Sequence, residues 1–241
     1  RDKVRTRVIA ASISDHMKAS DIVFIMGHQF SDLDAVGSAV GMWSAATKGV
    51  KKPAYIVIDR NATMAMPIVD EIEAVHDSEE KIFISEEEAL DMLTPRSLVI
   101  VVDTHSPDFV ESKELLNEAQ RVVVIDHHRM MVKHIDNAVV FYHEPYASSA
   151  SEMVSELVQY IGNTVLSKEE ADALLAGIML DTKNFVLKSG VRTFEAAAFL
   201  RRTGADTAEV RRYFQSDLPS MIQRYDIIRD AKMYHGDLAI A

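Results

Sequence analysis

Short runs of apolar and β-branched residues alternate with amphipathic stretches through the first 145 residues of the chain. The runs are apolar almost throughout, as is typical of parallel strands that are buried on both faces. Five of them predict strands: IVFIMG (22–27), AYIVID (54–59), KIFIS (81–85), LVIVVD (98–103) and RVVVID (121–126). The stretches between them predict helices over residues 34–48, 65–75 and 85–94. This alternation predicts an α/β fold with a mostly parallel, doubly wound sheet and helices on both of its faces.

The pattern changes after Pro145, where the strand signals nearly vanish. Helical spacing of apolar residues covers the ranges 148–161, 167–180, 194–203, 207–215 and 219–233. Two helix starts carry a capping box, in which a serine precedes a glutamate by one turn: Ser85 with Glu88, and Ser167 with Glu170. We therefore expect a helical C-terminal part to follow the sheet.

The two ends of the sequence suggest a piece of a longer protein. It starts without methionine, and its last residues, HGDLAIA, resemble the opening of a new strand that has no partner after it. We expect three parts: an N-terminal linker helix (1–20), a main domain (21–218), and a linker helix that leads into the start of a further, missing domain (219–241).

Composition narrows the classes of function. The 37 acidic residues outnumber the 26 basic ones, and the resulting net charge of −11 disfavours binding to long nucleic acid. A small phosphorylated ligand remains compatible, because bound divalent cations can reverse the local sign of a site. The lack of cysteine excludes disulfides and thiolate metal sites, and it fits a reducing cytosol. No apolar run approaches the roughly 18 residues that span a membrane.

Chemically active side chains gather where the predicted strands end. The stretch GHQFSDLDAVG follows the first strand, VVDTH and VVVIDHHR end two others, and LLAGIMLDTKNF ends an apolar helix. Together these stretches contribute His28, Asp32, Asp34, Asp103, Asp126, His127, His128 and Asp181. Parallel strands present their C-terminal ends at one edge of a sheet, where ligands usually bind. We therefore expect five of them to converge although they are far apart in the sequence: Asp32, Asp34, Asp103, His127 and His28. With Asp181 they make a set of four aspartates and two histidines.

Carboxylates crowded into one cleft repel each other, which raises their pKa values unless cations are present. Carboxylate and imidazole ligands without sulfur suit Mn²⁺, Mg²⁺, Fe²⁺ or Zn²⁺. The set is too large for one open catalytic ion. It suits two ions about 3.5–4 Å apart that share a bridging carboxylate and activate a water for attack at phosphorus. Against this, any single aspartate at a strand end is more often a turn former, and Asp34 could simply cap the helix that follows it.

Three further groups of residues allow more than one interpretation. Arg192 and Thr193 precede a helix, so they are candidates for substrate-phosphate binding, although a plain helix start with a solvated arginine is equally compatible. Three serines (148, 149 and 151) precede another helix, and capping is the favoured interpretation for them. His105 follows Asp103 closely and would either support the centre or face solvent.

The stretches GHQFSDLDAVG, VVDTH, IDHHR and LDTKNF resemble, in this order, the four motifs of the DHH phosphoesterase superfamily, named for the triplet at residues 126–128 here. Two flanking segments, VRTRVIAASISDHMKASDIVFIMGH and LDTKNFVLKSGVRTFEAAAFLRRTGAD, are similar to the membrane-tethered phosphodiesterases that hydrolyse cyclic di-AMP. In that group transmembrane, PAS-like and degenerate GGDEF segments precede the DHH domain, and a DHHA1 domain with a GGGH-type motif follows it. The resemblance implies that residues 21–218 are a DHH domain and that 219–241 lead into DHHA1.

The resemblance also implies a role for each side chain. His28, Asp32 and Asp103 would hold a first metal ion. The second ion would be held by Asp34, Asp103, His127 and Asp181, so that Asp103 bridges the pair. His128 would face the substrate phosphate and act in catalysis with Asp103, and Asp126 would orient the neighbouring histidines. The sequence departs from the family pattern at Gln29 and Ser31, where a basic residue and a proline are usual, and these changes leave the ligand set intact.

The implied activity is that of a manganese-dependent phosphodiesterase that opens cyclic di-AMP to 5′-pApA with a water activated by two metal ions. One alternative is hydrolysis of short linear oligonucleotides or pyrophosphate at the same centre. The other is a non-catalytic nucleotide-binding regulatory module. The full-length protein would act at the cytoplasmic side of the cell membrane, tethered by segments outside this sequence and compatible with a homodimer. The fragment alone would be soluble and would turn over substrate poorly.

Overall fold

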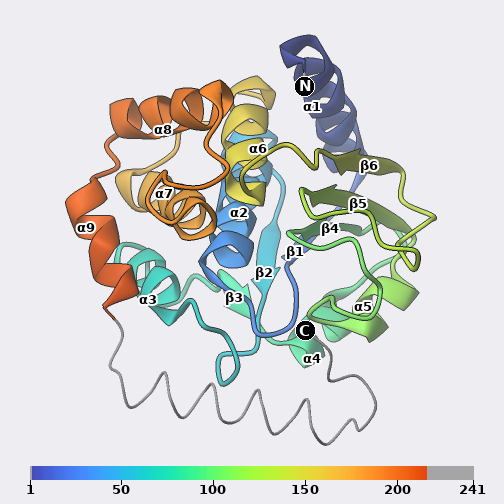
Figure 1. The fold of residues 1–241 in the computed structure, drawn as a ribbon. Helices are drawn as coiled ribbons and strands as arrows, with labels where there is room; N and C mark the ends of the chain where they lie inside the picture. The colour runs from blue at the N-terminus through green and yellow to red at the C-terminus, as the bar shows by residue number, and fades with distance from the viewer. Residues whose placement is uncertain (1, 216–241) are drawn as a thin grey trace, which may run out of the picture.

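The computed structural model describes residues 2–215. Its centre is a six-stranded sheet in the order β3-β2-β1-β4-β5-β6, in which every neighbouring pair of strands is parallel (Figure 1). The strands are β1 (Val23–Met26), β2 (Ala54–Val57), β3 (Phe83–Ile84), β4 (Leu98–Val102), β5 (Arg121–Asp126) and β6 (Val140–His143). The predicted α/β class and parallel sheet are thereby confirmed.

Nine α-helices surround the sheet within the described residues. They are α1 (Lys3–Ala19), α2 (Leu33–Ser44), α3 (Met66–Ala74), α4 (Glu86–Met92), α5 (Lys113–Glu118), α6 (Ala150–Leu157), α7 (Lys168–Thr182), α8 (Val191–Thr203) and α9 (Thr207–Arg211). A π-helical turn, Ala45–Gly49, extends α2, and 3-10 turns extend α6 (Val158–Tyr160) and α9 (Arg212–Phe214). The predicted helical part after Pro145 is present as α6 to α9 (Figure 1).

Each strand contributes to two separate hydrophobic cores, because successive side chains point to opposite faces of the sheet. In β1, Val23 and Ile25 belong to the larger core, while Phe24 and Met26 belong to the smaller one. The larger core is completed by α1, α2, α3, α6 and α7, and the smaller by α4 and α5. Burial on both faces explains why the central strands are apolar at successive positions, without the alternation of a half-exposed sheet.

The strand order places the reversal of chain direction at the centre of the sheet. The connection after β1 runs outward to β2 and β3, whereas β4, β5 and β6 follow on the other side of β1. In doubly wound folds, ligands bind beyond the C-terminal ends of the two strands at this switch point. Here those strands are β1 and β4, and the segments after them carry His28 and Asp103.

Several details differ from the sequence-based expectation. Strand β6 and helix α5 were not predicted, because β6 is an edge strand with alternating burial and α5 is only six residues long. Helix α8 begins at Val191, ahead of the predicted 194, where Gly190 donates its N–H to Thr193 Oγ1 (3.2 Å). The predicted helix over 219–233 and the strand-like end lie outside the described residues. None of the described helices has the length and apolar character that crossing a membrane requires.

Helices α2 and α7 lie in close contact because glycine occupies the point of approach. A Cβ added to Gly37 of α2 would lie 2.3 Å from the carbonyl oxygen of Ala173 in α7. Such a separation is far inside van der Waals contact, so any larger residue must push the two helices apart. Since α2 starts at the Asp32 cap and α7 ends beside Asp181, the spacing of these helices also sets the position of the candidate ligands.

The close approach predicts that Gly37→Ser lowers the free energy of unfolding by roughly 1–3 kcal/mol, the usual cost of overpacking. The matched control is Gly190→Ser, because a Cβ there meets no heavy atom within 4 Å and serine is a good N-cap. Urea unfolding should show a lower midpoint for the first variant and an unchanged midpoint for the second. Equal midpoints for the two variants would contradict the packing argument.

Candidate metal centre

A first group of ligand-type side chains lies at the switch point between β1 and β4. His28 Nε2 is 3.5 Å from Asp32 Oδ1 and 3.3 Å from Asp103 Oδ2. Asp32 is held in place as the N-cap of α2, where its Oδ1 accepts the Ala35 N–H (2.9 Å). One donor atom from each of His28, Asp32 and Asp103 therefore lies within 4.8 Å of the others.

A second group surrounds the imidazole of His127, just past the end of β5. His127 Nε2 is 3.2 Å from Asp103 Oδ1, 3.1 Å from Asp181 Oδ2 and 3.5 Å from Asp34 Oδ2. A single nitrogen thus faces three carboxylates that come from three different elements of the fold. These four residues also place a donor atom within 4.8 Å of one another.

Asp103 belongs to both groups. Its Oδ2 faces His28 and its Oδ1 faces His127, so one carboxylate connects the two clusters. The residue is 2% exposed and has a φ of 62°, a left-handed conformation that few non-glycine residues adopt. Burial, together with the charges of Asp34 and Asp32, raises the pKa of Asp103 well above its ordinary value. A carboxylate with two others nearby is therefore costly to ionise unless positive charge is supplied.

Asp34 receives its stabilisation from the start of another helix. Its Oδ2 accepts the N–H of Ala150 (2.9 Å), and its Oδ1 accepts the N–H of Ser151 (2.8 Å). Both donors are first-turn N–H groups of α6, which carry the positive end of the helix dipole. Although burial opposes it, contact with His127 and with Ser151 lowers the pKa of Asp34 to about 2. Asp34 is therefore an ionised, fully buried carboxylate, and Asp32 caps α2 in its place.

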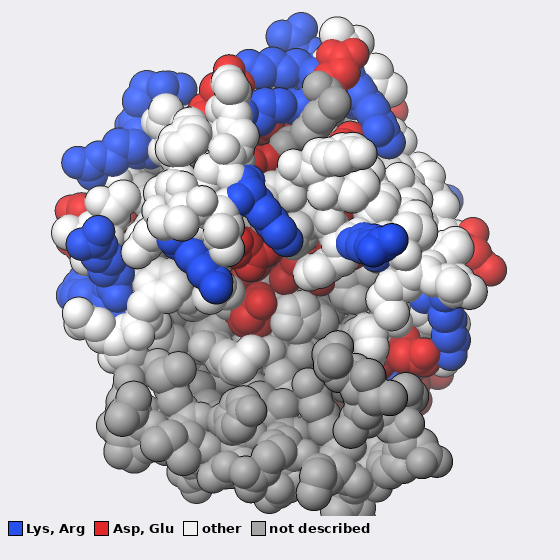
Figure 2. Space-filling model, viewed as in Figure 1, with Lys and Arg blue, Asp and Glu red and all other residues white. Residues whose placement is uncertain are grey.

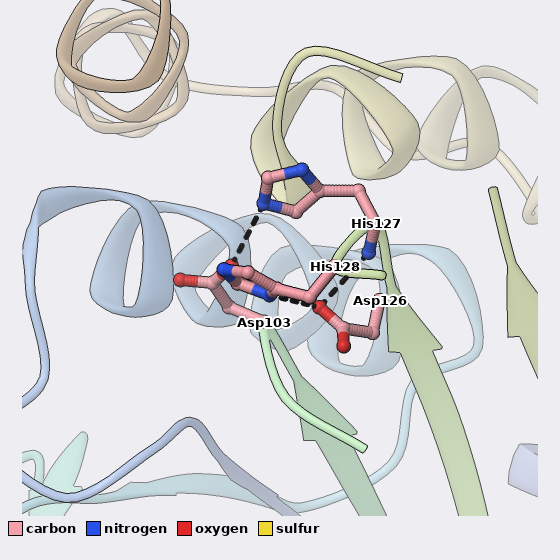
Figure 3. Close-up of side chains that lie close together, drawn as sticks. All are labelled: Asp103, Asp126, His127 and His128. Carbon is pink, nitrogen blue, oxygen red and sulfur yellow. Dashed lines mark hydrogen bonds and ion pairs between the residues drawn. The ribbon is translucent and has the colours of Figure 1, made fainter. Parts of the chain in front are cut away.

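Asp126 holds the neighbouring histidines without belonging to either group. Its Oδ1 accepts the His128 Nδ1–H (2.7 Å) and the backbone N–H of His127 (2.9 Å). Figure 3 shows the two imidazoles extending from the end of β5 toward Asp103 and Asp126. Because Nδ1 of His128 is engaged with Asp126, the orientation of the ring is fixed. His128 is also half-exposed, in contrast to the buried His127.

His105 is the supporting residue that sequence reasoning left undecided. It is 1% exposed, and its Nδ1 lies 2.5 Å from Asp126 Oδ2. The backbone N–H of Met131 donates to His105 Nε2 (2.9 Å), which fixes the tautomer with the proton on Nδ1. His105 therefore donates to Asp126 and orients it. The only sequence signal was its position in VVDTH, two residues after Asp103.

The structure places Arg192 and Thr193 in contact with other elements. Arg192 pairs with Glu156 of α6 and donates to Thr6 of α1 (3.1 Å), and Thr193 donates to Glu152 of α6. These bonds join α1, α6 and α8. A phosphate contact by either residue stays a prediction, and it would require these bonds to be exchanged. Of the three serines before α6, Ser149 is the N-cap.

The donor set fits a pair of hard or borderline divalent cations. It consists of carboxylate oxygens and imidazole nitrogens, which suits Mn²⁺, Mg²⁺, Fe²⁺ or Zn²⁺, and it has an excess of negative charge that cations would neutralise. Figure 2 shows acidic side chains recessed in the middle of one face of the molecule, with Lys and Arg side chains around them.

A parallel sheet with these motifs at its switch point defines a phosphoesterase-type domain. The DHH family, N-terminal domain, matches residues 22–178, and the chain belongs to this family.

Two curated relatives are cyclic-di-AMP phosphodiesterases. The chain is 40% identical to PdeA of Listeria monocytogenes serotype 1/2a (strain 10403S) and 39% identical to GdpP of Bacillus subtilis (strain 168). The alignments cover 100% of this chain and 37% of each relative, so the chain spans little more than a third of their length. Among solved structures, an exopolyphosphatase-related protein from Bacteroides fragilis has a similar fold, with a TM-score of 0.68 and 18% identity over 86% of this chain and 60% of that one.

The contact between His105 and Asp126 predicts a positioning role. We expect His105→Ala to lower kcat for a phosphoester substrate by roughly 10–100-fold, the usual effect of removing a group that orients a site residue. His105→Asn should recover most of the loss, because its amide N–H can occupy the place of Nδ1–H. The KM and the Mn²⁺ affinity should change less than kcat. A purely structural role would instead leave the two variants equally impaired.

The buried carboxylates predict that metal binding competes with protons. Burial, followed by the charge of Asp34, raises the pKa of Asp181 to about 7, from about 3.9 in an unfolded chain. Below the folded value a metal ion must displace this proton, so we expect the Kd for Mn²⁺ to fall as the pH rises from about 5 to about 7.5. In the metal-free chain the same shift stabilises the fold below about pH 4, and this contribution is lost as the pH rises through about 7. Calorimetric titrations across this pH range measure the Kd for Mn²⁺. A Kd that stayed constant would contradict the expectation.

Proposed function

We propose that this chain is the DHH part of a manganese-preferring phosphodiesterase that hydrolyses cyclic di-AMP to 5′-pApA. The observation that supports it most directly is Asp103, a buried carboxylate with one oxygen toward His28 and the other toward His127. Such a bridge between two ligand groups suits a two-ion centre. The named activity of both curated relatives, which the chain matches along its whole length, supports the substrate.

The residues divide into those that hold the ions and those that meet the phosphate. His28, Asp32 and Asp103 would hold one ion, and Asp34, Asp103, His127 and Asp181 the other. When bound, such a pair supplies a water of lowered pKa and neutralises charge that develops on the phosphate oxygens. Water would add to phosphorus, the bond from phosphorus to the ribose 3′-oxygen would break, and the 3′-oxygen would take up a proton. One such cleavage opens the ring and leaves a 5′-phosphate.

His128 would act on the phosphate. Its Nδ1–H is committed to Asp126, which fixes the ring, so Nε2 would meet the phosphate without rotation of the ring during the reaction. Hydrogen bonding to Asp126, although burial opposes it, raises the pKa of His128, so the ring carries positive charge more readily. A cationic imidazole in this position would stabilise the negative charge of the transition state. His105 would contribute indirectly, by fixing Asp126.

The same centre could serve shorter linear oligonucleotides or pyrophosphate, and the assay must separate these substrates. Turnover of cyclic di-AMP, pApA and pyrophosphate should be compared with added Mn²⁺, for this chain and for a longer chain that contains it. Cyclic di-AMP should be the preferred substrate. Preference for pyrophosphate or pApA would replace the proposed substrate, while nucleotide binding that needs no metal would favour a regulatory module.

Asp103→Asn is the sharpest test of the bridging role. The amide has the same shape but cannot bridge two cations, so we expect kcat to fall on the order of 10³-fold or more, the equivalent of several kcal/mol of transition-state stabilisation. The metal-free variant should be at least as stable as the parent chain, because the substitution replaces a buried carboxyl, whose ionised form is disfavoured beside two other carboxylates, with a neutral amide.

The matched control is Asp108→Asn, which makes the same chemical change at a side chain that is 47% exposed and that pairs, among residues 2–215, only with the exposed Lys133. It should leave turnover unchanged. Undiminished activity of Asp103→Asn would refute the bridge. Loss of activity together with loss of stability would mean that the residue acts through the fold.

A further inference from the structure

An open cavity of about 630 Å³ is lined by the segment that follows β6, the segment that joins α7 to α8 and the start of α8. Its walls include three aromatic side chains, Tyr146, Phe185 and Phe194. Tyr146 is 91% exposed and Phe194 is 53% exposed, so flat apolar surface faces solvent at this place. Soluble proteins seldom leave contiguous apolar surface uncovered unless it binds something.

Both walls of the cavity connect to the candidate centre, one through a hydrogen bond and the other along the chain. His143, at the end of β6, donates from Nε2 to the carbonyl oxygen of His128 (2.5 Å), and Pro145 follows two residues later. On the other wall, Phe185 follows Asp181 by four residues, so their Cα atoms are at most about 14 Å apart. A phosphate bound beside His128, at ions held by Asp181 and its neighbours, would therefore leave the remainder of its nucleotide close to the cavity.

The aromatic pair has the form of a stacking surface. Phe185 and Phe194 are stacked, with ring centroids 5.5 Å apart and an interplanar angle of 22°. Phe185 is half-buried and packs against the larger core, so it supports Phe194 from below. The segment that carries Phe185 is held in an unusual backbone conformation, since Lys183, Asn184, Phe185 and Lys188 all have positive φ. Such conformations persist where the surrounding structure requires them, often at ligand sites.

The charge at the cavity fits a nucleotide better than an apolar peptide. Lys188 is exposed and lines the wall, so a cation stands beside the aromatic rings in a chain whose net charge is −11. Flat rings with one adjacent cation suit a heterocyclic base joined to a phosphate. Base stacking on aromatic side chains is also tolerant of ring identity, which suits an open surface with few polar groups.

We propose that this cavity is the subsite for a nucleobase of the substrate, with the base lying on Phe194 and against Tyr146. The inference rests on the proposed function, because it assumes that a nucleotide phosphate occupies the neighbouring centre. It adds that this domain itself recognises the base, through stacking on Phe194 at the start of α8 and on Tyr146 in the segment after β6. The chemical class of ligand is therefore a nucleotide and not a bare phosphate or pyrophosphate.

The test compares the binding of AMP and of ribose 5-phosphate to the chain in the presence of Mn²⁺, measured by calorimetry. The two probes share the sugar and phosphate and differ by the base, so AMP should bind roughly tenfold more tightly. Phe194→Leu keeps apolar bulk but removes the flat ring, and it should abolish most of that preference without changing the Kd of ribose 5-phosphate. Tyr146→Leu is a second variant at a nearly fully exposed position, where folding is not at risk.

Phe214→Leu is the matched control, because it makes the same change at an exposed phenylalanine (38%) outside the cavity. It should leave both affinities unchanged. Equal binding of AMP and ribose 5-phosphate would overturn the base subsite while leaving the phosphate centre intact. An AMP preference that survives both cavity variants would also overturn it, because the base would then lie elsewhere. Failure of both probes to bind with Mn²⁺ would count against the proposed function and the subsite together.

Discussion

The repulsion between buried carboxylates at the switch point is the constraint on which the rest of the arrangement depends. Asp103 lies near Asp32 and Asp34 with almost no access to water, so its ionised form is strongly disfavoured in the absence of cations. The fold counters part of this cost with the two imidazoles, His28 and His127, and with the N-terminus of α6. These groups do not neutralise the cluster fully, since Asp181 also keeps a raised pKa. The remaining negative charge would favour binding of divalent cations, and an affinity of this kind would be gained at the expense of the metal-free fold.

The topology of the sheet explains how residues so far apart in sequence come together in one cluster of buried carboxylates and imidazoles. Strands β1, β4 and β5 each deliver one chemically active segment to the same edge, and the reversal between β1 and β4 opens the space that those segments fill. Helices α2 and α7 bring Asp34 and Asp181 to that space, and their close approach at Gly37 leaves little freedom for either to shift. Rigid packing behind the site thus fixes ligand positions that mutual repulsion would otherwise spread apart.

Sequence reasoning succeeded where the signal was local and failed where it depended on tertiary partners. The central strands could be predicted because burial on both faces makes them continuously apolar, and the ligand-type residues could be located because they follow those strands. Strand β6 was missed because its alternating burial, with Phe141 and His143 partly exposed, gives only a short and mixed pattern. The role of Asp34 at the start of α6 could not be read from the sequence, since its partners lie more than a hundred residues away. For the same reason the burial of His105 against Asp126 and the pairing of Arg192 with Glu156 become visible only in three dimensions.

Two short segments carry most of the connections around the centre. The segment from β6 to α6 contacts the His128 carbonyl through His143, lines the aromatic cavity at Tyr146, and binds the Asp34 carboxylate at Ala150. The segment after Asp181 forms the opposite wall of the same cavity. Asp34 therefore holds the end of one wall, and Asp181 lies at the start of the other. Neutralisation of these two carboxylates by cations would affect both walls of the cavity. Metal and base recognition would then share structural elements, so a domain with the centre filled should present a better ordered surface to a nucleotide than the metal-free chain does.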